Sequence, residues 1–228
     1  MIEFNNSAIP DLKEYLNVKQ LKYRDRKHAA KAVAFHFRKL NPKTEKELDH
    51  FYTTCDDYVY ENTFCNSEGS CKMRMPKIVE ALSMLGAHSV LEIGAGIGTY
   101  ALNLEKEGYD VSVTEGSDLA YRFMRWRFKK YDSKIKVIKK IEEKYDAIIF
   151  FDVIEHIKDP FKFLTDVSKN CNGLIFIAAF GVHRPDMGGY PQHFDFKIKD
   201  IQKHLERLKF KKLKINTIFP PHVYERKG

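Results

Sequence analysis

The chain contains 228 residues, of which 43% are hydrophobic and 31% are charged, and both fractions are ordinary for a soluble globular domain. No apolar run reaches the roughly 20 residues that a membrane-spanning helix needs, and the first residues lack the order of a secretory signal. We therefore expect a cytoplasmic protein without membrane contact. The net charge of +8 is compatible with an acidic partner, but most of it comes from lysines scattered along the whole length.

Helical patterns dominate the first part of the chain. Apolar residues recur at helical spacing between residues 11 and 40, and Pro42 then acts as a stop signal. Thr44 followed by Glu47 predicts a capping box that opens a second helix. We expect residues 1–72 to form a helical lid and residues 73–228 to form the core domain.

Aromatic residues gather after this second helix, at Phe51, Tyr52, Tyr58, Tyr60 and Phe64. They either line a ligand pocket or pack as the core of the helical lid. Tyr58 and Tyr60 are the candidate substrate contacts, because a phenol combines an apolar ring with a polar group suited to a wet pocket.

Four cysteines in a cytosolic chain do not predict disulfide bonds. Three of them, Cys55, Cys65 and Cys71, lie near His50, but their irregular gaps argue against a structural zinc site, which normally uses short paired spacings. Cys171 is expected as a small buried residue at the start of a strand.

A strand, a glycine turn and a helix follow the predicted helix 74–85. Residues 90–93 are apolar except for Glu92; Gly94, Gly96 and Gly98 form the turn, and residues 101–107 continue as a helix. This arrangement lets backbone N–H groups approach a polar ligand closely. Nicotinamide and flavin enzymes share it, but the third glycine of their fingerprint falls at a different position.

A carboxylate marks each of the next two strands. Residues 110–115 form a second strand that ends at Glu115, placed to accept both hydroxyls of a ribose. Residues 145–151 form another buried strand, and Asp152 follows it directly. Between them, a predicted helix carries a basic cluster that is either a solvated face or a patch for a polyanion: Arg122, Arg125, Arg127, Lys129 and Lys130.

The C-terminal part predicts a further buried strand over 174–180, a polar loop over 181–192, a helix over 198–208 and a late strand over 211–218. In folds that alternate strands and helices, the loops at the carboxyl ends of the strands hold the substrate. Arg184, suited to a carboxylate or phosphate, and Tyr190 are therefore candidate substrate contacts, although an exposed loop arginine needs no such role.

Three motifs follow one another along the chain: the glycine turn at 94–98, the strand that ends at Glu115, and the strand that Asp152 follows. In this order they resemble the class I S-adenosylmethionine-dependent methyltransferases, particularly the branch that contains the ubiquinone-pathway O-methyltransferases. The acidic Glu92, two positions before the first glycine, is part of that resemblance. It implies an α/β, Rossmann-like sheet of seven mostly parallel strands in the order 3-2-1-4-5-7-6, flanked by helices.

The resemblance also implies the cofactor contacts. It assigns Glu92, Gly94, Gly96 and Gly98 to the methionine end of S-adenosylmethionine and Glu115 to the ribose. The adenine contact would come from the short loop 139–144, with Glu142 or Glu143, and Asp152 would lie where the sulfonium and the acceptor meet.

Methyl transfer to a hydroxyl acceptor usually needs a base or a metal ion that lowers the acceptor pKa. Asp152, His156 and His193 are the candidate catalytic residues. With Glu155 they resemble the metal set of ubiquinone O-methyltransferases and small-RNA 2′-O-methyltransferases. Those families carry a longer Glu where this chain has Asp152, and the Glu-His pair also occurs in relatives without a metal, so we predict no metal.

The sequence thus predicts transfer of a methyl group to an oxygen, or less readily a nitrogen, of a small-molecule acceptor. An RNA 2′-O-methyltransferase is the alternative, motivated by the charge and the histidines, although no separate RNA-binding module is visible. A non-catalytic cofactor-binding subunit is a more remote alternative, which the intact glycines and carboxylates argue against.

Overall fold

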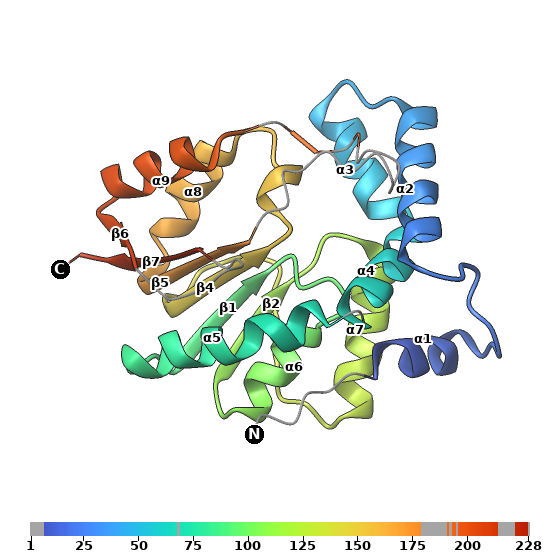
Figure 1. The fold of residues 1–228 in the computed structure, drawn as a ribbon, viewed down its shortest axis with the longest axis horizontal. Helices are drawn as coiled ribbons and strands as arrows, with labels where there is room; N and C mark the ends of the chain where they lie inside the picture. Colours follow the sequence, from blue (N-terminus) through green and yellow to red (C-terminus); the bar gives the residue numbers. More distant parts are fainter. Residues whose placement is uncertain are drawn as a thin grey trace.

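The computed structural model describes residues 7–67, 69–178, 191, 193–194, 196–213 and 222–227. Figure 1 shows a central twisted sheet with helices on both faces and an N-terminal group of helices at one end of the sheet. The sheet strands are β1 (Ser89–Ile93), β2 (Asp110–Thr114), β3 (Lys136–Val137), β4 (Tyr145–Phe151), β5 (Cys171–Ala178), β6 (Phe210–Lys212) and β7 (His222–Arg226).

The strand order is β3-β2-β1-β4-β5-β7-β6, which confirms the predicted topology. All neighbouring pairs from β3 to β5 are parallel, and β7 pairs antiparallel with both β5 and β6. The parallel strands therefore direct their carboxyl ends, and the loops that follow them, toward one edge of the sheet.

Two apolar layers cover the sheet, because successive residues of its strands point to opposite faces. Val90 of β1 packs toward α5 (Ser70–Met84), α6 (Thr99–Lys106) and α7 (Asp118–Lys130), whereas its neighbour Leu91 packs toward α8 (Pro160–Ser168) and α9 (Ile198–Arg207). Burial on both faces explains the long hydrophobic runs at the centre of the sheet, in β4 and β5.

The N-terminal segment contains α1 (Ala8–Leu16), α2 (Arg26–Leu40), α3 (Glu45–Thr54) and α4 (Asp57–Ser67). The predicted capping box of Thr44 and Glu47 at the start of α3 is confirmed. The helical pattern between residues 11 and 40 is divided into two helices, because Asn17 ends α1 in the left-handed conformation and the Asp25 side chain caps α2.

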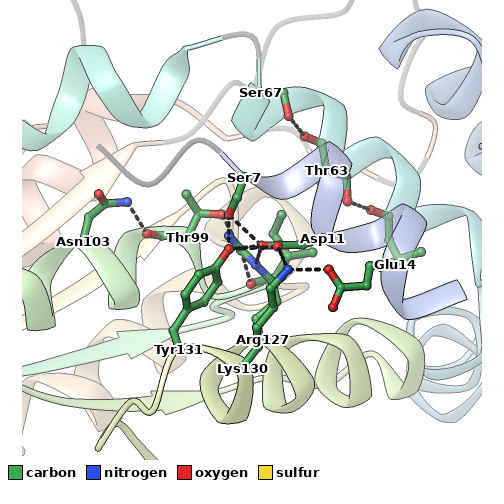
Figure 2. A network of polar contacts seen from close by, with 12 residues as sticks. Ser7, Asp11, Glu14, Thr63, Ser67, Thr99, Asn103, Arg127, Lys130 and Tyr131 are labelled. Carbon is green, nitrogen blue, oxygen red and sulfur yellow. Dashed lines mark hydrogen bonds and ion pairs between the residues drawn. The ribbon is translucent and has the colours of Figure 1, made fainter. Parts of the chain in front are cut away.

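Arg127 corrects the interpretation of the basic cluster on α7. Its side chain is fully buried, whereas the other four cations of that cluster are exposed. Figure 2 shows it directed at Asp11 of α1, together with Lys130 and Tyr131. The sequence predicted either a solvated face or a patch for a polyanion. Neither alternative includes Arg127, which is buried and paired with Asp11.

The C-terminal strands differ in part from the prediction. Cys171 is buried at the start of β5, as expected, and the strand begins there rather than at Leu174. The expected strand over 211–218 is represented by β6, and its residues from 214 onward lie outside the described residues. β7 was not identified from the sequence.

The predicted domain division at residue 72 stays a prediction, and it falls inside α5. Within the described residues, no helix combines the length and the apolar character that crossing a membrane requires.

Candidate active site

The glycine turn after β1 has the backbone conformation that its sequence predicts. Gly94, Gly96 and Gly98 have φ values of +67°, +57° and +73°. A Cβ atom on Gly94 would lie 2.6 Å from Val153 Cγ2, and one on Gly98 would lie 2.6 Å from Phe128 Cε1. Glycine is therefore required at both positions by conformation and by space.

Glu115 at the end of β2 is tied to this turn. Its Oε2 accepts a hydrogen bond from the Gly96 N–H at 2.6 Å, and its Oε1 accepts one from the Ser117 N–H at 2.7 Å. Burial raises the carboxyl pKa, against the effect of these backbone donors. Each oxygen still has a lone pair available, so the carboxylate is fixed in place and able to accept further hydroxyl donors.

Glu92 near the end of β1 is only 3% exposed. Its Oε2 is enclosed and has no hydrogen-bond partner among the described residues. Burial raises its pKa to about 8, while a hydrogen bond from the Ala101 backbone acts in the opposite direction. An enclosed carboxylate oxygen without a partner is costly, and a bound cation or donor group would relieve that cost.

Asp152 follows β4 in the left-handed conformation, with φ +56°. Its N–H donates to the Ala178 carbonyl at 2.6 Å, which holds the carboxylate at the edge of the sheet. Oδ2 accepts a hydrogen bond from Arg74 Nη1 at 3.3 Å, whereas Oδ1 is enclosed and has no hydrogen-bond partner among the described residues. Burial raises the carboxyl pKa, and the Arg74 charge opposes this shift.

A pair of histidines lies beyond Asp152. The rings of His156 and His193 meet edge-to-face with centroids 4.7 Å apart, and the Tyr52 hydroxyl lies 2.9 Å from His156 Nδ1. Burial lowers the pKa of His156 to about 3 and that of His193 to about 4. Both imidazoles are therefore neutral near neutral pH, and each has one donor and one acceptor nitrogen.

The structure brings together some of the predicted substrate contacts and separates others. The Tyr58 ring lies 6.2 Å from that of His156, but Tyr60 packs edge-to-face on Tyr23 at 5.3 Å. The sequence offered no reason to choose between two tyrosines only two positions apart. Arg184 and Tyr190 lie outside the described residues.

Glu142 is exposed in the segment after β3. It lies just beyond Ile138, whose N–H donates to the Val113 carbonyl and so prolongs the pairing of β2 and β3. Its assignment as the adenine contact stays a prediction.

The four residues that resemble a metal set do not converge. No three of Asp152, Glu155, His156 and His193 place their ligand atoms together, and Asp152 instead pairs with Arg74. The Tyr52 hydroxyl lies within hydrogen-bond distance of His156 Nδ1. The four side chains are therefore not an assembled set of metal ligands in the described structure, and the prediction of no metal stays a prediction.

Three neighbours of the site were missed in the sequence. Arg74 of α5 contacts both Asp152 and the Tyr100 hydroxyl, and Tyr52 of α3 contacts His156. Asn62 of α4 lies beside the glycine turn, where its Nδ2 would be 3.2 Å from a Cβ atom on Gly96. The aromatic run was a signal for Tyr52, but nothing local distinguishes Arg74 or Asn62.

Residues 25–210 match the family described as "Methyltransferase domain", and the chain belongs to this family. Its fold is that of the class I S-adenosylmethionine-dependent methyltransferases, and the protein is a methyltransferase that uses S-adenosylmethionine. The more specific resemblance to the ubiquinone-pathway branch stays a prediction. No curated protein matches the sequence at a significant level.

Solved structures support the fold. Magnesium protoporphyrin IX methyltransferase from Synechocystis PCC 6803, with bound S-adenosylmethionine, is similar with a TM-score of 0.56 and 13% identity, over 91% of this chain and 100% of that one. TehB from Haemophilus influenzae is similar with a TM-score of 0.54 and 18% identity, over 67% of this chain and 62% of that one. At these identities the likeness concerns the fold alone.

The residues at the carboxyl ends of β1, β2 and β4 fit the cofactor. The enclosed oxygens of Glu92 and Asp152 suit its cationic groups, and the fixed Glu115 carboxylate suits its ribose hydroxyls.

Proposed function

We propose that this enzyme methylates an oxygen atom of a small-molecule acceptor, held between Asp152 and the pair of His156 and His193. S-adenosylmethionine supplies a methyl group that is already activated on a sulfonium. The protein therefore has to orient the acceptor, exclude water and receive a proton where the acceptor is a hydroxyl.

The cofactor contacts are part of the proposal. Glu92 would hold the amino-acid end of the cofactor, because its enclosed Oε2 lies in a buried site that a cation would satisfy. Glu115, fixed by two backbone donors, would accept the ribose hydroxyls. Asp152 would complete the negative surround of the sulfonium, with Arg74 keeping its carboxylate oriented.

The neutral histidine pair is the observation that favours oxygen over nitrogen. A neutral imidazole nitrogen can accept the hydrogen bond of an acceptor hydroxyl, which an amine acceptor does not require. The Tyr52 hydroxyl at Nδ1 fixes the ring of His156, and Tyr58 adds an aromatic edge on the same side. Tyr52 on α3 and Tyr58 on α4 thus form an aromatic wall beside the histidine pair. Both helices belong to the part of the chain expected to form a lid.

The test uses methyl-labelled S-adenosylmethionine with an extract of the source cells, separated by size after incubation. We expect label in the small-metabolite fraction, in a form that hydriodic acid releases as iodomethane, as expected for an O-methyl group. Label that resists this treatment would indicate nitrogen and overturn the oxygen assignment. Nuclease-sensitive label in large material would overturn the small-molecule acceptor and favour RNA.

Two variants connect the activity to the site. Asp152→Asn and His156→Gln should each lower the turnover by about 100-fold, the order expected for a positioned polar or proton-transfer group. Asp166→Asn is the matched control, because this exposed carboxylate of α8 pairs only with surface lysines in the described structure. Unchanged turnover in both site variants would place the acceptor elsewhere.

A further inference from the structure

A second polar cluster lies in the N-terminal segment, apart from the methyl-transfer site. It consists of His36 on α2, Cys55 between α3 and α4, and Asp57 at the start of α4. Their ligand atoms lie within 4.8 Å of one another, with His36 Nδ1 at 2.9 Å from Asp57 Oδ2 and 3.9 Å from Cys55 Sγ. Among the described residues, no other His, Cys, Asp and Glu side chains converge in this way.

The Asp57 carboxylate is held so that one oxygen faces the cluster. The side chain is 1% exposed, and its Oδ1 accepts hydrogen bonds from Lys22 Nζ at 2.8 Å and from the Tyr23 hydroxyl at 2.5 Å. Its Oδ2 is enclosed and receives no hydrogen bond among the described residues, although it faces His36. Partners on the outer oxygen that orient the inner one are typical of carboxylates that ligate metals.

We propose that His36, Cys55 and Asp57 bind a divalent transition-metal ion of the zinc type. One nitrogen, one sulfur and one oxygen ligand suit this borderline-soft ion. On binding, the Cys55 thiol loses its proton to solvent and a metal–sulfur bond forms. The thiolate and the carboxylate together then balance the two positive charges of the ion, while the imidazole remains neutral.

The surroundings provide access to the cluster. A cavity of about 290 Å³ adjoins the cluster, and its lining consists of His36, Lys39, Leu40, His50, Phe51, Thr54 and Cys55. It gives the ion an entry path and leaves room for a water molecule as fourth ligand. Burial, with the charges of Asp57 and Asp56, raises the pKa of Cys55 to about 11, so that without an ion the thiol stays protonated.

The site differs from the one considered on sequence grounds. Cys71 is buried on α5, where its sulfur accepts a hydrogen bond from Asn103, and neither it nor Cys65 joins the cluster. Cys55 and Asp57 are two positions apart, but His36 lies 19 positions before Cys55. The packing of α2 against α4 brings His36 to the other two ligands.

The bound ion would fasten α2 to the junction of α3 and α4. Phe51, Tyr52 and Tyr58 pack in the same apolar cluster as Cys55, and Tyr52 is the residue that contacts His156. A metal at this junction would therefore stabilise the aromatic wall beside the acceptor site. It would contribute to folding rather than to the chemistry of transfer.

The test is a titration of the full-length, reduced protein with Co²⁺, followed by competition with Zn²⁺. We expect one Co²⁺ per chain, with the near-ultraviolet charge-transfer absorption of a cobalt–thiolate bond, displaced by Zn²⁺. Cys55→Ser should abolish that absorption. Cys65→Ser is the matched control and should retain it, because Cys65 lies on α4 outside the cluster.

Two further variants keep the test independent of the cysteine. His36→Gln changes a side chain that is 46% exposed, so folding should survive, and we expect at least about 10-fold weaker binding. Tyr23→Phe removes one donor from the outer oxygen of Asp57 and should weaken binding by about 10-fold. Absence of thiolate absorption in the native protein, or equal affinities in native protein and His36→Gln, would overturn the site. Neither readout depends on methyltransferase activity.

Discussion

The Arg127 guanidinium donates a hydrogen bond to Asp11 Oδ2 at 2.9 Å, and both side chains are buried, at 0% and 1% exposure. Lys130 Nζ and the Tyr131 hydroxyl also donate to the Asp11 carboxylate, as Figure 2 shows. Burial acts to raise the pKa of Asp11, but these donors, with Ser7 and the Arg127 charge, hold it below its ordinary value.

The same guanidinium connects α1 to the cofactor turn. Arg127 Nη1 donates to the Ile97 carbonyl at 2.7 Å and to Thr99 Oγ1 at 2.9 Å. Ile97 lies within the glycine turn, and Thr99 is the first residue of α6. Arg127 on α7 therefore links α1 to the glycine turn: it binds Asp11 of α1 and also the Ile97 carbonyl of the turn.

Breaking this ion pair should destabilise the protein strongly. Asp11→Asn leaves the buried Arg127 charge uncompensated, and Arg127→Met leaves the carboxylate without its buried guanidinium partner, so each should lower the free energy of unfolding by about 3–5 kcal/mol. Urea unfolding measures this. The exposed pair of Asp110 and Lys136 gives the control, and Asp110→Asn should cost less than about 1 kcal/mol. Equal losses in both pairs would contradict the structural role.

The contribution of Asp11 should also depend on pH. Because its folded pKa lies below the ordinary 3.8, the unfolded chain binds a proton first as the pH falls. The stabilisation is complete above that value and is lost as the pH falls through the folded pKa. The difference in unfolding free energy between native protein and Asp11→Asn should therefore be constant near neutral pH and shrink below about pH 4. A constant difference at all pH values would contradict this.

The sequence predicted what local patterns encode. Strand, glycine turn and helix around Gly96 were identified from apolar periodicity and turn residues, and the sheet order followed from the family resemblance. Arg127 was not predictable, because its burial depends on a partner 116 positions away. Tyr60 and Tyr58 could not be separated either, since the side that α4 turns toward His156 is decided by packing against α2 and α1.

The close contact between Gly94 and Val153 should make the glycine turn sensitive to a single methyl group. Gly94→Ala combines a positive φ with a Cβ atom 2.6 Å from Val153 Cγ2, so we expect loss of stability and of S-adenosylhomocysteine binding. Gly108→Ala is the matched control, because it has φ +93° but nothing within 4 Å, and strain alone costs about 1–2 kcal/mol.

A second substitution separates strain from collision at this position. Val153→Ala removes the methyl groups that a Gly94 side chain would meet, so the double variant Gly94→Ala/Val153→Ala should be more stable than Gly94→Ala alone. Thermal unfolding and calorimetric binding of S-adenosylhomocysteine measure both effects. If the double variant were as impaired as Gly94→Ala alone, the collision with Val153 would not be the cause.

Glu92 should make cofactor affinity dependent on pH. Its pKa of about 8 means that the carboxyl is protonated in the free protein near neutral pH, whereas pairing with a cationic group requires the carboxylate. Binding then releases a proton, and affinity should rise from about pH 6 to about pH 8, by at most tenfold per pH unit. Calorimetry with S-adenosylhomocysteine measures this. Glu92→Gln should bind more weakly and follow a flatter profile; parallel profiles would contradict the assignment.

The neutral state of His156 should appear in the stability of the protein. Burial lowers its pKa from 6.5 to about 3, so below about pH 6.5 the unfolded chain takes up a proton that the folded chain does not. Stability contributed by the neutral ring is therefore present above that pH and declines as the pH falls. His156→Gln should lose less unfolding free energy than the native protein between about pH 7.5 and about pH 5, measured with urea. Identical slopes in the two proteins would mean that the His156 ring takes up a proton in the folded state, and would remove the basis for its role beside an acceptor hydroxyl.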